Sequence, residues 1–153
     1  MNIKEEIEKR DSTIKVLEIL KNYFSVKRDN AEASMNKAAV INLREFYKGQ
    51  ICAYQDDMDS IDEEISSYKL PTIEQLITYL ISSGCKRNDV KENYDFTVFE
   101  VKGDDYGNMI KIVLPGSPVS EEDYREQILS AINLMAVVHE STIEEIINDI
   151  KVY

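Results

Sequence analysis

Few residues in this sequence could act as a catalytic nucleophile or base. Its single histidine is His139, and its two cysteines are Cys52 and Cys85. Catalysis of the Ser-His-Asp or Cys-His type would have to use His139, together with a thiol or a serine that folding brings close. His139 falls in the last turn of an expected helix, where the helix dipole stabilises an imidazolium. We therefore interpret His139 as structural and predict no catalytic residue.

Carboxylates are the most abundant groups that could do chemistry, and six of them lie within residues 56–64. They interleave with Met58, Ile61 and Ile65, so on a helix they project away from the apolar side. A metal site in a helical bundle needs inward-pointing Glu or Glu-x-x-His ligands, and the sequence contains no Glu-x-x-His. The phosphate-binding motifs GxxxxGK[ST] and GxGxxG are also absent. We expect no metal and no cofactor, and we assign an exposed acidic face to Asp56, Asp59, Asp62 and Glu63.

Composition limits the classes of partner. The 153 residues carry 29 acids and 18 bases, a net charge of −11, which disfavours a generic nucleic-acid-binding protein. Residues 1–28 are an exception, with seven bases and five acids. Apolar runs are too short to span a membrane, and the start, MNIKEEIEKR, lacks the apolar core of a signal peptide. We therefore expect a cytoplasmic protein that does not bind membranes and whose two cysteines stay reduced.

Apolar spacing predicts two long helices at the N-terminal end. The first covers residues 3–27, and its apolar face is widened by Val16, Ile19 and Tyr23, so we expect it to pack on two neighbours. The polar segment 27–33 is where we expect the chain to reverse. A second and longer helix then covers residues 30–68.

The second half of that longer helix has heptad spacing. Val40, Leu43 and Tyr47 upstream are out of step with it, which predicts a stutter at Gly49. This glycine is either a tolerated helical residue or the place where another helix crosses closely. The stripe itself either packs on the first helix or binds a partner helix, including that of a second copy. The six residues of this stripe are Ile51, Tyr54, Met58, Ile61, Ile65 and Tyr68.

A smaller mixed module follows from Leu70. Thr72-x-x-Gln75 is a capping box that opens a short helix, and Gly84 is its expected stop. Runs of β-branched and aromatic residues then predict strands, and two further helices close the chain, the last opened by a capping box at Ser141-x-x-Glu144. The expected strands cover 85–90, 95–102 and 109–114, and the helix between them and the last one covers 120–139.

The order helix, strand, strand, strand, helix over residues 72–138 resembles HicA-type messenger-RNA interferase toxins and, more distantly, double-stranded-RNA-binding domains. The segments that carry the resemblance are TIEQLITYLISSGCKR, DFTVFEVK and MIKIVLP. It covers less than half of the chain and rests on layout. HicA toxins have a histidine at the start of the second strand, where this sequence has Glu92-Asn93-Tyr94-Asp95. The resemblance therefore implies a small α/β module reused for binding, without the nuclease chemistry.

Together these patterns predict an α+β protein with a helical hairpin or coiled coil in residues 1–69 and an α-β-β-(β)-α-α module in residues 70–153. The leading function hypothesis is a non-catalytic interaction or regulatory protein that self-associates through its long helices. Two alternatives stay open. One is the RNA-directed HicA-like module, and the other is an acidic inhibitor that mimics nucleic acid, as some mobile elements encode.

Overall fold

The computed structural model describes residues 2–92, 94–103, 108–115 and 120–153 and has the predicted α+β architecture. The chain divides into two units. We call Glu8–Lys69 the hairpin unit and Met1–Ile7 with Leu70–Tyr153 the mixed unit. Each is described by itself.

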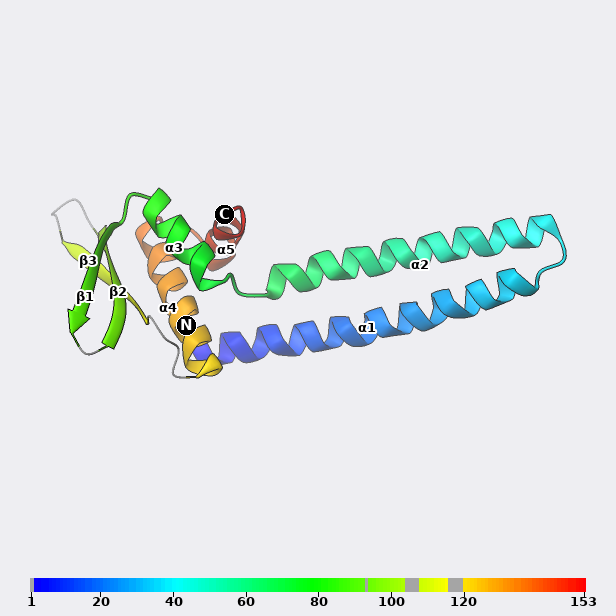
Figure 1. The fold of residues 1–153 in the computed structure, drawn as a ribbon, viewed down its shortest axis with the longest axis horizontal. Coiled ribbons are helices and arrows are strands. Elements are labelled where there is room, and N and C mark those ends of the chain that lie inside the picture. Colours follow the sequence, from blue (N-terminus) through cyan, green and yellow to red (C-terminus); the bar gives the residue numbers. More distant parts are fainter. Residues whose placement is uncertain (1, 93, 104–107, 116–119) are drawn as a thin grey trace. The chain divides into compact units, whose positions relative to one another are not determined.

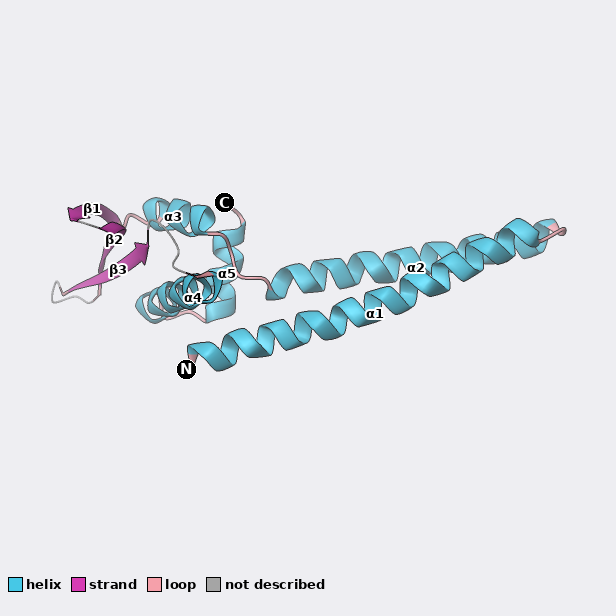
Figure 2. Ribbon diagram, turned by 60° about the horizontal axis from the view of Figure 1, so that its bottom comes forward, coloured by secondary structure: helices cyan, strands magenta, loops and turns pink. Residues whose placement is uncertain are grey.

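The hairpin unit consists of two long antiparallel helices, α1 (Ile3–Lys37) from Glu8 onward and α2 (Ile41–Tyr68). They lie side by side in both views (Figures 1 and 2). The predicted reversal at 27–33 is wrong, because α1 continues through this polar segment, which contains no glycine or proline. The chain turns between Lys37 and Ile41 instead. There Val40 has an extended backbone, and Arg44 Nε donates to the Ala38 carbonyl oxygen at 2.7 Å.

The facing sides of α1 and α2 follow a continuous heptad pattern, in steps of three and four residues. Upstream of Tyr47 the pattern cannot be followed, because Leu43 is 44% exposed and Arg44 is exposed as well, so the stutter stays a prediction. Gly49 has no atom within 4 Å of the position of a Cβ, so it is a tolerated helical glycine in this chain. The residues at the inward positions of this pattern are all buried or half-buried: Arg10, Ile14, Leu17, Lys21, Phe24, Arg28, Ala31 and Met35 in α1, Ala38 directly after α1, and Tyr47, Ile51, Tyr54, Met58, Ile61, Ile65 and Tyr68 in α2.

The mixed unit has a three-stranded antiparallel sheet of order β1-β2-β3, in which all three predicted strands are present. Helices α3 and α4 lie against one face of this sheet, and α5 packs on both of them (Figure 1). The element bounds are α3 Ile73–Ser82, β1 Lys86–Glu92, β2 Tyr94–Lys102, β3 Met109–Pro115, α4 Glu121–Val138 and α5 Ile143–Lys151.

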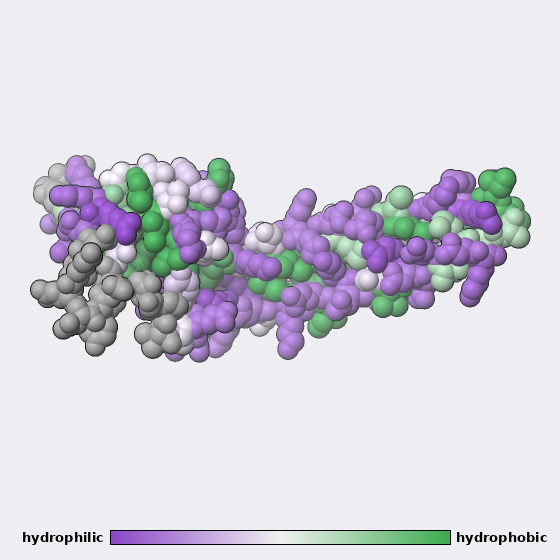
Figure 3. All heavy atoms as spheres, in the orientation of Figure 1, coloured by the Kyte–Doolittle hydropathy of each residue, from purple (hydrophilic) through white to green (hydrophobic). Residues whose placement is uncertain are grey.

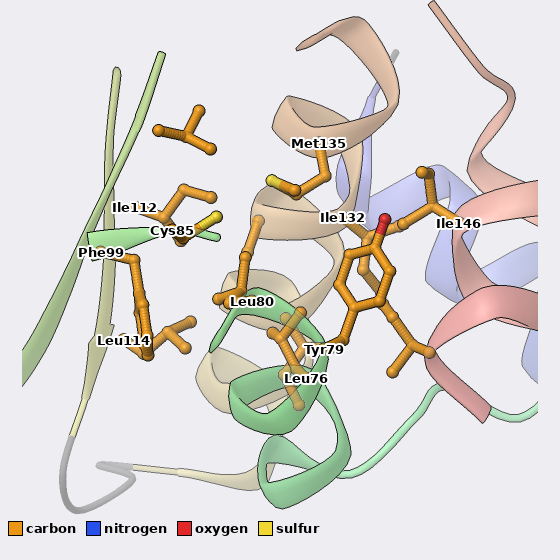
Figure 4. Packing of buried hydrophobic residues seen from close by; sticks show 14 of the residues in the cluster. Leu76, Tyr79, Leu80, Cys85, Phe99, Ile112, Leu114, Ile132, Met135 and Ile146 are labelled. Carbon is orange, nitrogen blue, oxygen red and sulfur yellow. The ribbon is translucent and has the colours of Figure 1, made fainter. Parts of the chain in front are cut away.

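The core of the mixed unit lies between the sheet and its helices. Alternate residues of β2 and β3 point inward, so Phe99 and Leu114 are fully buried. They meet apolar side chains of the helices, among them Leu76, Leu80 and Ile132 (Figure 4). Helix α5 also contributes to this core, and its buried residues are Ile146, Ile147 and Ile150.

The predicted capping box at the start of α3 is confirmed, since Thr72 Oγ1 accepts from Gln75 N at 3.3 Å and Gln75 Oε1 accepts from Thr72 N at 3.0 Å. The box at the start of α5 lies one residue later than predicted, at Thr142 and Glu145. Position 142 is the one at which the backbone is extended (φ −85°, ψ 159°) before the helical turn begins. Hydrogen bonds from Thr142 hold the pKa of Glu145 below its usual value.

Helices α3 and α4 end in the same way, with one residue in the left-handed region. In α3 this residue is the predicted Gly84 (φ 81°), and Cys85 N donates to the Leu80 oxygen at 3.0 Å. In α4 it is Glu140 (φ 52°), and Ser141 N donates to the Ala136 oxygen at 2.9 Å.

Replacing the glycine at position 84 and introducing a glycine at position 140 should change the free energy of unfolding in opposite directions. Gly84→Ala should lower the free energy of unfolding of the mixed unit by about 1 kcal/mol, because alanine is strained at positive φ. Glu140→Gly should raise it by about 0.5 kcal/mol, since glycine removes that strain but loses more chain entropy on folding. Urea unfolding followed by circular dichroism measures both changes. Two changes of the same sign would contradict the assignment of equivalent helix ends.

Candidate protein-interaction surface

The stripe predicted for binding, Ile51 to Tyr68 on α2, faces α1 of the same chain. Met58, Ile61 and Ile65 are buried, and the Tyr54 ring lies 6.2 Å from the Phe24 ring between centroids. The remaining two residues, Ile51 and Tyr68, are half-buried. In this chain the stripe therefore has the intramolecular role that the sequence left open.

Basic side chains occupy three of the inward positions of α1 and bind polar groups of α2. Lys21 Nζ lies 2.6 Å from each carboxylate oxygen of Asp62. Arg28 donates to Gln55 at 3.1 Å. Arg10, only 2% exposed, donates to the backbone oxygen of Tyr68 at 3.4 Å. Polar residues at such positions lower the stability of a helix pair but select its alignment, so these contacts favour one antiparallel register of the hairpin.

The opposite side of α1 carries apolar residues that α2 does not cover. Val16, Ile19, Tyr23 and Val26 have exposed fractions of 64%, 63%, 54% and 60%. Their spacing is again three, four and three residues, the pattern of a helix-packing seam. We call these four residues the outer stripe. Leu20 beside them is 41% exposed.

The sequence prediction anticipated part of this surface. The widened apolar face formed by Val16, Ile19 and Tyr23 predicts two neighbours for this part of α1, and within the described hairpin unit one neighbour, α2, is present. The sequence prediction missed Val26, although the step of three residues from Tyr23 was a usable signal. Lys27 Nζ lies 5.3 Å above the Tyr23 ring, a cation–π contact at the edge of the stripe.

A second exposed apolar group lies where the hairpin turns. The side chains of this group are 44% to 75% exposed. Figure 3 shows apolar atoms at the end of the hairpin where the chain turns. It has no sustained heptad spacing, because it spans the turn and the first helical turns of α2. Its members are Val40, Ile41, Leu43 and Phe46.

The predicted acidic face is exposed on α2. Asp56, Asp59, Asp62 and Glu63 are all accessible to solvent. Asp62 binds Lys21 within the hairpin, and Asp59 accepts from Gln55 at 2.7 Å. Among the described residues no three His, Cys, Asp or Glu side chains are placed to hold a metal ion.

The single histidine and the two cysteines differ in their exposure to solvent. His139 is exposed at the C-terminal end of α4, and its backbone N–H donates to the Met135 oxygen at 2.9 Å. Cys85 is buried in the core, and burial raises the pKa of its thiol, which lowers its fraction of reactive thiolate. Cys52 is exposed on α2.

The elements α3, β1, β2, β3 and α4 have the order on which the HicA resemblance rests. The resemblance would place that family's catalytic histidine within residues 92–95 of this chain. Asn93 and the side chains of the other three residues lie outside the described part of the structure. On the sheet face away from the helices, Lys111 lies 3.7 Å from Glu100.

No helix in the described part of the chain is both long and apolar enough to cross a membrane. No family model, no curated protein and no solved structure matches this chain.

Proposed function

We propose that this protein is a non-catalytic interaction protein that self-associates through its hairpin unit. The observation that carries the proposal is the outer stripe on α1. Four large apolar side chains, each more than half exposed, repeat at heptad spacing on the side of α1 opposite to α2. Burying such side chains against a partner is favourable by about 25 cal/mol per Å² of apolar surface.

The spacing of the stripe supports a helix as the partner. Scattered single apolar residues are common on protein surfaces and need no partner. A three-four-three repeat, however, puts one side chain per helical turn on a single line, which is how helices pack on each other. Apart from Leu20, the residues that flank the line are charged or polar, as in protein interfaces with an apolar centre and a polar rim.

Light scattering over a range of protein concentrations tests the proposal. The natural protein should have twice the mass of one 17.6 kDa chain at micromolar concentration. Ile19→Glu should raise the dissociation constant at least about a hundredfold, equivalent to about 2.7 kcal/mol, because a carboxylate would be buried at the interface. Circular dichroism should show unchanged helix content.

Ala53→Glu is the matched control, since it adds the same charge to an exposed position on α2. It should leave the mass of the natural assembly unchanged. A natural protein that is monomeric at about 100 µM would overturn the proposal, and so would an Ile19→Glu variant that associates as tightly as the natural chain.

The element order of the mixed unit supports RNA binding as a second candidate function. Helices cover one face of its sheet, and the other face exposes Val113 and Lys111. Retention of single- and double-stranded RNA on the purified protein at low salt tests this candidate. If the protein neither retains nor cleaves either RNA, the candidate fails, whatever the oligomeric state.

A further inference from the structure

We infer that the occupant of the outer stripe is the α1 helix of a second copy, docked antiparallel about a two-fold axis near Leu20. This inference rests on the proposed self-association and adds the identity and direction of the partner helix. In this arrangement both copies use the same surface, as a two-fold interface requires.

The spacing of the stripe fits an antiparallel copy of itself. When Val16 faces Val26 of the second copy, Ile19 faces Tyr23 of that copy, and the same pairs recur on the other side of the axis. All four residues of the outer stripe are then covered by one another. The interface is centred on residue 21 of both chains, so its apolar part is symmetric.

Charges beside the stripe favour the antiparallel direction. On one flank lie Lys15, Asn22 and Asp29, each seven residues apart and exposed. An antiparallel copy brings Lys15 of one chain towards Asp29 of the other, and the reverse. An in-register parallel copy would instead place Lys15 opposite Leu20, on the other flank of the second chain, where it meets no opposite charge. Opposite charges at flanking positions of paired helices select orientation in this way.

The residues on the same side of α1 beyond the outer stripe also favour the antiparallel direction. Lys9 lies seven residues before Val16, on the same line of the helix. An antiparallel copy places Ala33 opposite Lys9, whereas a parallel copy places a second Lys9 there. Like charges brought together at an interface are destabilising. The seam of α1 is thus free of like-charge pairs only in the antiparallel direction.

The other flank of the outer stripe contains one apolar residue, Leu20. It is 41% exposed, although its neighbours on that flank, Thr13 and Lys27, are polar. Since it lies next to the centre of the interface, the two-fold axis brings Leu20 of one copy against Leu20 of the other. An apolar residue at this position of the flank is therefore covered in the dimer.

The alternative surface for the same stripe, α2 of the second copy, fits less well. The middle of its outward side carries Asp56, Asp59 and Glu63 at helical spacing, all exposed. Packing Val16 and Ile19 on that side would bury carboxylates against apolar side chains, which is costly. The structure therefore favours α1 on α1.

Disulfide cross-linking tests the direction in the full chain. In a background of Cys52→Ser, which removes the exposed thiol, Val16→Cys and Val26→Cys variants carrying tags of different mass are mixed and oxidised. The expected product is the mixed dimer, linked between positions 16 and 26. Efficient formation of 16–16 and 26–26 homodimers in the separate samples, without the mixed product, would overturn the antiparallel arrangement.

A charge exchange gives an independent readout by light scattering. Lys15→Glu and Asp29→Lys should each weaken association about three- to tenfold, because each places like charges across the interface. The double variant should restore the affinity of the natural protein. Failure of that rescue in a protein that still dimerises overturns the antiparallel inference alone, whereas a monomeric natural protein overturns the proposed function as well.

Discussion

Replacing Phe99 with alanine should lower the free energy of unfolding of the mixed unit by about 3–5 kcal/mol, the usual cost of removing a fully buried aromatic ring. Phe99 is 0% exposed and lies in the cluster that joins the sheet to α3 and α4. Because a domain of this size is stable by only about 5–15 kcal/mol, the loss is a large share of the total. Urea unfolding followed by circular dichroism measures it, with the hairpin unit fitted as a separate transition.

Val113→Ala is the control for this experiment. It removes a side chain from the adjacent strand, but from the other face of the sheet, where Val113 is 50% exposed. Its effect should stay below about 1 kcal/mol. If the two substitutions cost the same, the sheet does not bury the face that carries Phe99.

The second large effect is expected in the hairpin unit. Ile61→Glu places a carboxylate at a position of α2 that is only 8% exposed and faces α1. We expect a loss of at least about 3 kcal/mol, because the group must be buried charged or bind a proton. Long helices without an apolar partner are marginal in water, so much of the α1 and α2 helix signal in circular dichroism should disappear.

Ile19→Glu makes the same chemical change on the outer side of α1, at a residue that is 63% exposed. It should keep the helix signal of the monomer and weaken only self-association. The pair of variants thus separates folding of the hairpin from pairing between copies. Loss of helix in both would mean that the hairpin folds only in the assembly, and retention of helix in both would contradict the inward placement of Ile61.

The helices and strands of the mixed unit could be predicted because the sequence patterns that mark them are local. A capping box at Thr72, a glycine at position 84 and a change of apolar period from about 3.6 to 2 each act within a few residues. The structure has α3 and all three strands close to their predicted bounds. The box at the start of α5 was misplaced by one residue because Ser141 and Thr142 are both good caps, each followed three residues later by glutamate.

The turn of the hairpin was not predictable in this way. Residues 27–33 are polar, but polarity alone does not end a helix when the residues are good helix formers. The true turn between Lys37 and Ile41 has no glycine or proline to announce it. Its position follows from matching inward positions on both helices, which is a property of the pair.

For the candidate surface too, part was predictable from the sequence and part depends on how the helices pair. The sequence contains two apolar lines on these helices, Ile51 to Tyr68 on α2 and Val16 to Val26 on α1. Helical periodicity determines that each line exists, since it depends only on spacing along the chain. Which line is covered depends on which helix lies beside it.

The amino-acid order by itself therefore determined the α+β class, most helix and strand bounds, the exposed acids of α2 and the presence of heptad stripes. Each of these depends on neighbours within a few residues. Only the tertiary structure decided that Ile51 to Tyr68 faces α1 while Val16 to Val26 faces solvent. The reason is that the alignment of two helices is set by contacts between residues far apart in the chain, such as Lys21 with Asp62. Those contacts turn one side of α1 towards α2 and leave the outer stripe exposed to solvent.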